Sequence, residues 1–301
     1  MNEQLPTIST KPRNAFMACF LSLVLSGLGQ VYNGQLKKAI VLIGLLLFIP
    51  ILFGITRGTT CFGGFLLLYA IKWILKIYAV IDAWINAKRQ KDYVLKSYNT
   101  WYYYLVIALI AFVVFGLYNS PAVLGTQSFK VPSISGNPTI QLEDRIIADM
   151  KAYKNKTPDY GDIVVFLGVN GQKYTFRVVG LPNDNVEIND NIVTINNKPS
   201  KTTFIKETTD ENRLVSELEE ELPNGHKHLI FLLKQPDNGT IRNIEDIVVP
   251  ADSYFLLGDN RDNAFDSRYQ GFINKERIKG RVLYSYMGQT IDRINIDFRN
   301  K

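Results

Sequence analysis

The chain has 301 residues, of which 47% are hydrophobic and 21% are charged. These totals exclude an intrinsically disordered or collagen-like chain, and two cysteines (Cys19 and Cys61) are too few for a disulfide scaffold. Lys and Arg outnumber Asp and Glu by 34 to 28, which suits an anionic partner. Because the long apolar runs lie before residue 122, we expect that partner to be a lipid bilayer and expect no nucleic acid.

Four apolar segments are candidates for membrane spans, which need about 20 mostly apolar residues each. In chain order they are residues 15–32, 39–56, 62–85 and 101–121. The first segment is short and rich in glycine at its end, so it either crosses the membrane or is re-entrant. We therefore predict that residues 1–121 form a membrane-anchoring region with three or four transmembrane segments.

Basic residues predict the orientation of this region. The segment 86–99 contains Lys88, Arg89, Lys91 and Lys96. The positive-inside rule places such a loop in the cytoplasm, so the fourth segment runs outward and residues 122–301 lie outside the cytoplasm. Lys11 and Arg13 favour an N-terminus on the inside, which a re-entrant first segment would allow. The stretch LSGLGQVYNGQ (25–35) resembles the glycine turn of small two-helix membrane modules.

Short apolar runs that alternate with polar residues follow Pro121, including DIVVFLGV, YTFRVVGL and YFLLGD. Period-two runs bounded by Gly, Pro, Asn or Asp are typical of antiparallel strands. We predict an all-β, mainly antiparallel domain over residues 122–301, after a multi-span α-helical membrane region. Residues 200–245 are the most polar part and are predicted to be an inserted cap of strands and one helix, the helix within 210–222.

Few residues of the polar half have the chemistry of a metal or cofactor site. It contains no cysteine, and its two histidines, His226 and His228, are not clustered with acids at ligand spacing. Walker and dinucleotide motifs are absent from the sequence. We therefore expect no metal and no cofactor. Because both histidines lie in a polar turn-like segment, a Ser-His-Asp triad is not expected, and their substitution should be nearly silent.

Two segments remain as candidates for catalysis, PSISGNPT (132–139) and GDNRDNAFDSR (258–268). In this order, and together with YGDIVVF (160–166) and FRVVGLPNDNVEI (176–188), they resemble the motifs of bacterial type I signal peptidases. Members of that family are membrane-anchored serine endopeptidases that remove signal peptides from exported proteins. The resemblance covers residues 120–290 and implies an all-β domain with a smaller β extension, which agrees with the strand pattern.

The resemblance also implies roles for individual residues. Ser135 would be the nucleophile, and Ser133 would contribute its hydroxyl, with the backbone N–H of Ser135, to the oxyanion hole. Asp266 and Arg268 would form a structural ion pair beneath the site. The same loop would be shaped by three further residues, namely Asp259, Asn260 and Arg261.

Two positions depart from the family pattern. The family's general base is a lysine directly before the Arg-Val-Val-Gly-Leu-Pro run, and Phe176 stands there. The residue that orients this lysine is a small hydroxyl or amide residue, and Ala264 occupies that position. Lys173 lies three residues before Phe176, so on a strand it should point to the opposite face. Arg177 cannot act as a base because its pKa is too high.

The leading hypothesis is a membrane-bound serine endopeptidase of the signal peptidase I type, located in the bacterial cytoplasmic membrane. Its C-terminal domain would face the periplasm or exterior, and its partners would be the signal peptides of exported preproteins and the lipid bilayer. The alternative, favoured by Phe176 and Ala264, is an impaired or inactive homologue. Such a protein would bind exported chains or act as a membrane scaffold.

Overall fold

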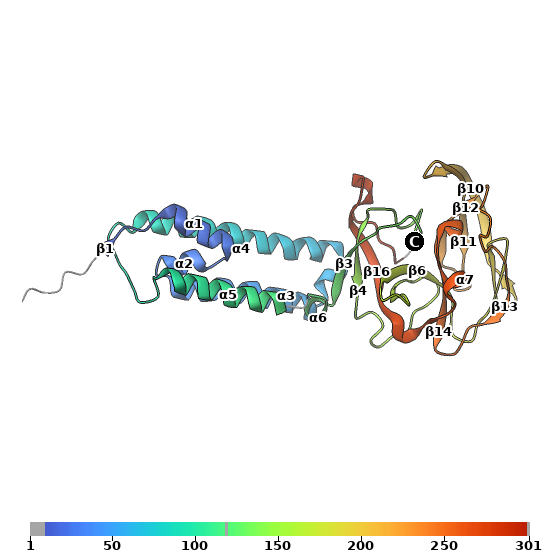
Figure 1. Cartoon of the computed structure of the whole chain (residues 1–301), viewed down its shortest axis with the longest axis horizontal. Helices are drawn as coiled ribbons and strands as arrows, with labels where there is room; N and C mark the ends of the chain where they lie inside the picture. The colour runs from blue at the N-terminus through green and yellow to red at the C-terminus, as the bar shows by residue number, and fades with distance from the viewer. Residues whose placement is uncertain (1–9, 118–119, 300–301) are drawn as a thin grey trace, which may run out of the picture. The chain divides into compact units, whose positions relative to one another are not determined.

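The computed structural model describes residues 10–117 and 120–299, and the chain divides into two compact units. The first unit, here called the helical unit, comprises Met1–Thr59 and Gly63–Leu124. The second, the β unit, comprises Thr60–Phe62 and Gly125–Lys301. Figure 1 gives the labels of the helices and strands in both units.

The helical unit contains six α-helices within the described residues and one short strand pair. The helices are α1 (Ala15–Val24), α2 (Leu28–Tyr32), α3 (Leu36–Ile55), α4 (Phe62–Arg89), α5 (Trp101–Leu117) and α6 (Ser120–Leu124). The strand β1 (Thr10–Lys11) pairs with β2 (Tyr93–Val94). By length and composition, α3 and α4 could each cross a membrane, with mean hydropathies of 2.6 and 1.8. The apolar helices α1 and α5 are shorter.

The apolar segment 15–32 is not one continuous helix. The chain leaves α1 after Val24 and starts α2 at Leu28, with Gly27 between them at a φ of 108°. This left-handed conformation is one that glycine adopts without strain. A side chain at Gly29 would meet the Ala18 carbonyl oxygen at 2.2 Å, so a second glycine is needed for the close approach of α2 to α1.

Buried polar side chains join α2 to α4. The Gln30 amide donates to the Ala79 carbonyl oxygen at 2.7 Å, and the Asn33 amide donates to the Ala83 carbonyl oxygen at 2.8 Å. Buried polar groups need such partners because unpaired ones are costly away from water. The glycine-turn segment therefore acts as a packing element inside the helical unit.

The β unit is built on a seven-stranded antiparallel sheet in the order β15-β14-β6-β5-β16-β4-β3. Its strands are β3 (Thr126–Lys130), β4 (Arg145–Asp149), β5 (Ile163–Leu167), β6 (Lys173–Gly180), β14 (Ser253–Leu257), β15 (Ile273–Asn274) and β16 (Ile278–Met287). The register shifts within the β14–β6, β16–β4 and β16–β5 pairs. Such bulges bend strands and increase their twist. Residues of β5 alternate between two core clusters: Val164 and Phe166 in one, Ile163 and Val165 in the other.

Two smaller sheets complete the β unit. One has the order β13-β7-β8-β9, with β7 (Asn185–Asn189), β8 (Ile192–Ile195), β9 (Lys198–Pro199) and β13 (Ile244–Val248). The other, here called the inserted sheet, consists of β10 (Lys201–Asp210), β11 (Arg213–Glu221) and β12 (Lys227–Leu233). A short helix, α7 (Ser267–Gln270), follows β14 (Figure 1).

The predicted helix within 210–222 is wrong, because these residues form the turn and the second strand of a hairpin. Asp210 pairs with Arg213, so Glu211 and Asn212 alone make the turn, with φ values of 45° and 66°. Two central residues with positive φ are the mark of a type I′ turn, the tight turn whose twist matches a hairpin. The strand buries Val215 and Glu220 completely in the folded chain.

Candidate active site

Ser133 and Ser135 lie in the loop that joins β3 to β4, here called the serine loop (131–144). The Ser135 hydroxyl is half-buried and donates to the Asn263 carbonyl oxygen at 3.1 Å. The exposed Ser133 hydroxyl donates to Ser135 Oγ at 3.4 Å. The two hydroxyl groups that the sequence singled out are therefore within reach of each other.

A second loop, here called the acidic loop (258–266), packs against the serine loop. A Cβ atom at Gly258 would lie 2.3 Å from Ala264 Cβ, 2.8 Å from the Ser135 carbonyl oxygen and 3.4 Å from Phe176 Cε1. Only glycine fits where three segments approach so closely. The structure thus brings Ser135, Phe176 and Ala264 together around one glycine, although they are far apart in the sequence.

Phe176 lies on β6 and is almost fully buried. Its ring packs 5.8 Å from the Phe166 ring, centroid to centroid. Phe176 and Ala264 belong to one core cluster, together with Val164 and Val178. Both side chains are purely apolar, so neither can accept a proton from a neighbouring hydroxyl.

A mainly apolar groove of 400 Å³ runs past the two serines. Its lining includes Ser133, Ser135, Phe129, Ile140, Ile146, Val165, Thr175, Phe176 and Phe265. Among the described residues that line it, the only amines are those of Lys130 and Lys173. Lys130 forms an ion pair with Glu143 at 2.6 Å, and the Lys173 ammonium donates to Gln127 Oε1 at 3.1 Å.

Lys173 lies three residues before Phe176 on β6, and both residues line the groove. Lys173 takes an odd position on β6, opposite Leu167, whereas Phe176 takes an even one, opposite Val164. Strand alternation therefore separates the two residues as expected. Both nevertheless line the same groove, because it extends along the β6 backbone past both positions.

Arg177 and Asp259 form a buried ion pair beneath the site. Arg177 Nε and one terminal nitrogen donate to the two Asp259 oxygens at 2.8 and 2.7 Å, and the residues are 1% and 5% exposed. Burial alone would raise the pKa of Asp259, but the Arg177 charge and its hydrogen bonds hold that pKa below its ordinary value. The other Arg177 terminal nitrogen lies 3.1 Å from His226 Nε2. No sequence pattern indicates this contact, because the two residues are 49 positions apart.

Asp266 and Arg268 form a second buried ion pair, at 2.8 Å. Asp266 Oδ2 also accepts the Gly258 N–H at 3.0 Å, so the pair fixes the start of the acidic loop. Arg268 continues to the four-stranded sheet, where it donates to Asn191 Oδ1 at 2.9 Å. These bonds stabilise the loop that carries Ala264.

Arg261 pairs with Glu220 of the inserted sheet, and both are buried. Burial would raise the pKa of Glu220, but the Arg261 charge and the neighbouring His228 hold it far below its usual range. His228 Nε2 lies 3.2 Å from Glu220, and burial lowers the pKa of this imidazole. The histidines were expected in a polar turn without apolar strands around them. That expectation is wrong for His228, which is 3% exposed and lies on β12.

The inserted sheet contributes acidic side chains that bond to the loops of the site, and no sequence pattern indicated them. Asp210 accepts from the side-chain amides of Asn137 and Asn260, and Glu220 accepts from Arg261. Their partners lie 41 to 73 positions away along the chain. No local pattern could have found them, since hydrogen bonds at such separations depend on the tertiary fold. Within the described residues, no group of three or more His, Cys, Asp or Glu side chains could hold a metal ion.

The antiparallel β unit, with its two adjacent serine hydroxyls beside an apolar groove, is an arrangement suited to acyl transfer from a peptide. The chain belongs to the signal peptidase family, peptidase S26, whose model matches residues 100–287.

Curated relatives are bacterial signal peptidases. The chain is 30% identical over 163 residues to a probable signal peptidase I-2 of Synechocystis sp., a match that covers 52% of this chain and 61% of that protein. It is 28% identical over 165 residues to a signal peptidase I of Leptolyngbya laminosa, with 52% and 66% covered. The matches thus span less than two thirds of each of these relatives. A crystal structure of a signal peptidase I from Enterococcus faecalis aligns at 25% identity and a TM-score of 0.25, covering 42% of this chain and 97% of that chain.

Proposed function

We propose that this protein is a membrane-bound serine endopeptidase of the signal peptidase I type, which removes signal peptides from exported preproteins. The observation that carries the proposal is the position of Ser135. Its hydroxyl lines an apolar groove and lies 3.4 Å from a second hydroxyl, that of Ser133. Membership of the signal peptidase family supports the same reading.

In this proposal Ser135 Oγ attacks the scissile carbonyl carbon, and the leaving amine departs to give an acyl-enzyme. Water then hydrolyses the ester. The Ser133 hydroxyl and the Ser135 backbone N–H would donate to the oxyanion that forms in both steps, the role that usually gives the largest single stabilisation. The apolar lining of the groove, with Ile140, Ile146 and Val165, suits small apolar substrate side chains such as those of Ala-X-Ala sites.

Removal of the proton from the Ser135 hydroxyl is the difficult step. On the family pattern the base would stand at Phe176 and its orienting partner at Ala264, and neither residue can do this. General-base assistance is worth about 10²–10⁴-fold in rate. At about 1.36 kcal/mol per decade, that is about 3–5 kcal/mol of activation free energy. The groove amines, Lys130 and Lys173, are engaged as ammonium groups with Glu143 and Gln127. Cleavage then requires that the Ser135 proton pass to water, or to one of these lysines after it has lost its own proton.

A second candidate function follows from the same two positions. Phe176 and Ala264 pack tightly into one apolar cluster, which is what a groove used for binding alone would tolerate. Such a protein would bind exported chains without cleaving them, or act as a membrane scaffold through its helical unit. In both functions the protein would be a multi-pass protein of the bacterial cytoplasmic membrane, with the β unit outside the cytoplasm. Its partners would be signal peptides and the lipid bilayer.

Complementation of a conditional signal-peptidase mutant separates the two functions. The full chain should restore growth, Ser135→Ala should not, and Ser97→Ala, an exposed serine of the helical unit, should behave as wild type. Growth with Ser135→Ala would exclude Ser135 as the nucleophile. Failure of all three proteins to restore growth, together with equal binding of a labelled signal peptide by wild type and Ser135→Ala, would favour the binding function.

A further inference from the structure

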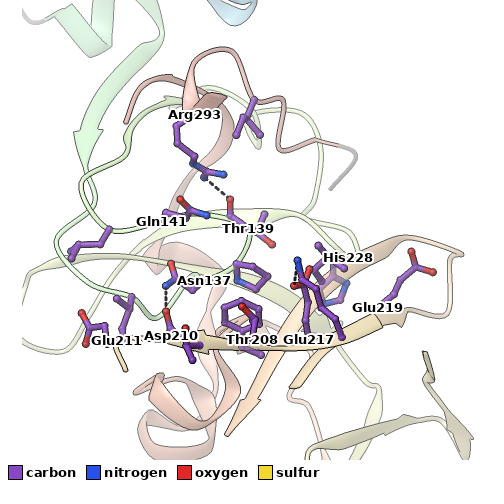
Figure 2. Close-up of a pocket in the computed structure, with 18 of the residues that line it drawn as sticks. Asn137, Thr139, Gln141, Thr208, Asp210, Glu211, Glu217, Glu219, His228 and Arg293 are labelled. Atoms are coloured by element: carbon purple, nitrogen blue, oxygen red, sulfur yellow. Dashed lines mark hydrogen bonds and ion pairs between the residues drawn. The ribbon is translucent and has the colours of Figure 1, made fainter. Parts of the chain in front are cut away.

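The carboxylate of Asp210 joins the two loops of the site. Asp210 is the last residue of β10 in the inserted sheet and is 8% exposed. Its Oδ1 accepts the Asn137 side-chain amide at 2.7 Å, a bond that Figure 2 shows as a dashed line. Its Oδ2 accepts the Asn260 side-chain amide, also at 2.7 Å. Asn137 belongs to the serine loop and Asn260 to the acidic loop, so one carboxylate bridges both.

Both asparagines also donate hydrogen bonds to the peptide segment that carries Ser135. Asn260 donates its backbone N–H to the Ser135 carbonyl oxygen at 3.1 Å and its side-chain amide to the Ile134 carbonyl oxygen at 3.2 Å. Asn137 follows Ser135 by two residues, and its backbone N–H donates to the Ile134 carbonyl oxygen at 2.9 Å. Asp210 therefore fixes the segment 134–137 from two sides.

The inserted sheet is itself attached to the acidic loop, so Asp210 has a fixed position. The Phe231 N–H donates to the Asp259 carbonyl oxygen at 2.9 Å, and the Leu233 N–H donates to Asp262 Oδ2 at 2.8 Å. Hydrogen bonds to an ionised acceptor are about twice as strong as neutral ones. Loss of the carboxylate would remove one hydrogen-bond acceptor from each of the two asparagine amides.

The geometry points to Asp210 as a positioning residue of the site, which orients Ser135 through Asn137 and Asn260 without touching the substrate. This role rests on the proposed function in so far as Ser135 is the reacting group. Through Asp210, the inserted sheet supplies the carboxylate that sets the relative position of the serine loop and the acidic loop.

The test compares variants of the full chain in detergent. Asp210→Asn keeps the size of the side chain but replaces one acceptor by a donor, which opposes the amide of Asn137 or Asn260. The double variant Asp210→Asn with Asn137→Asp restores every bond. The new amide at 210 would accept from Asn260 and donate to the new carboxylate, and Asn137 Oδ1 has no partner to lose. Glu207→Gln is the matched control, since Glu207 lies on the same strand and pairs with Lys234 at the surface.

Two readouts are measured, amide hydrogen exchange and preprotein turnover. Asp210→Asn should speed exchange in residues 133–142 and 258–263 only, and should lower kcat about 10- to 100-fold with KM unchanged, as a small misplacement of a nucleophile does. The double variant should recover both values, and Glu207→Gln should match wild type.

Two results would overturn the role. In the first, amide hydrogen exchange and kcat in Asp210→Asn are the same as in Glu207→Gln. In the second, Asp210→Asn exchanges faster across the whole β unit and the double variant does not recover, which would show a general effect on stability. If wild type itself shows no turnover, the proposed cleavage fails. Local exchange that rises in Asp210→Asn and recovers in the double variant would still establish the bridge.

Discussion

The phenyl ring of Phe176 and the methyl group of Ala264 occupy the space next to the Ser135 backbone, where Gly258 leaves room for both. A lysine at position 176 would stand between Val164, Val178 and other apolar neighbours, so burial would lower its pKa toward neutrality and make it a usable base. It would lack a partner to orient its amine, because Ala264 has no hydrogen-bonding group. This pair of residues is therefore where a loss of catalytic power can be tested by reconstruction.

We expect the double change Phe176→Lys with Ala264→Ser to raise preprotein cleavage by about 10²-fold or more, the usual contribution of a general base. The gain should exceed that of the two single changes combined, since residues that act as one unit are not additive. Turnover in detergent is compared for wild type, both singles, the double, and the double with Ser135→Ala, which should be inert. A folded double variant with no gain would show that the groove differs from an active one at further positions.

His228 makes stability depend on pH. Burial, followed by the nearby Arg177 charge, lowers the pKa of this imidazole below the value of about 6.5 that it has in an unfolded chain. Between the two pKa values the unfolded state binds a proton that the folded state does not, so the free energy of unfolding falls as pH drops below about 6.5. The neighbouring acids Glu220 and Asp259 have lowered pKa values and lose their contribution only in more acidic solution, below about pH 4.

Thermal unfolding between pH 5 and 7.5 measures this effect. Wild type should lose stability through the acidic half of that range, and His228→Gln should show a shallower dependence because the titrating group is gone. An unchanged slope in His228→Gln would mean that the buried imidazole does not titrate in this way.

The ease of prediction differed between residues of the site for a physical reason. The ion pair of Asp266 and Arg268, two positions apart, was implied by the family resemblance of the motif that contains both residues. Asp210 and its partner Asn137 are 73 positions apart, and only the assembled sheet brings them together. Sequence motifs therefore located Ser135 and the acidic loop but gave no sign of the acids that the inserted sheet contributes.

At the scale of elements, three hairpins of the β unit use the same two-residue turn. The central residues are Asp190–Asn191, Asn196–Asn197 and Glu211–Asn212, and all six have positive φ. The strands of the β unit were predicted correctly because short apolar runs such as β5 and β6 are bounded by turn residues. The acids and leucines between Asp210 and Leu222 also suit a helical surface, which is why the sequence favours a helix there. The two-residue turn at Glu211 and Asn212 instead makes this run part of a hairpin.

The turn between β8 and β9 offers a test of this account. Asn197 is exposed and has a φ of 64°, a conformation in which Asn and Gly are favoured and a residue such as Ala is strained. Asn197→Ala should lower the free energy of unfolding by about 1 kcal/mol, whereas Asn197→Gly, which creates the preferred Asn-Gly turn, should keep or slightly raise it. Urea unfolding of the two variants gives the comparison, and equal stability would argue against a left-handed turn here.

At the scale of the whole molecule, the chain combines a helical unit with a β unit of different composition. Within the described residues, α3 and α4 are the two helices long and apolar enough to cross a bilayer. The first apolar segment is divided into α1 and α2 around Gly27, and α5 is shorter. The sequence left two possibilities for the first segment, a crossing or a re-entrant one, and the division into α1 and α2 suits the re-entrant one. The orientation of the β unit then depends on the basic segment between α4 and α5.

Reporter fusions test that orientation. Lys88 and Arg89 end α4, and Lys91 and Lys96 follow before α5, so we expect this basic stretch to remain in the cytoplasm. Alkaline phosphatase, which is active only outside the cytoplasm, should therefore be active when fused after residue 125 and inactive when fused after residue 92. A fluorescent protein that folds only inside should give the reverse pattern at the same two sites. Activity of the phosphatase at 92 but not at 125 would place Ser135 in the cytoplasm. Secretory signal peptides are cleaved on the outer face, so that result would exclude the proposed function, however favourable the geometry of the serine loop.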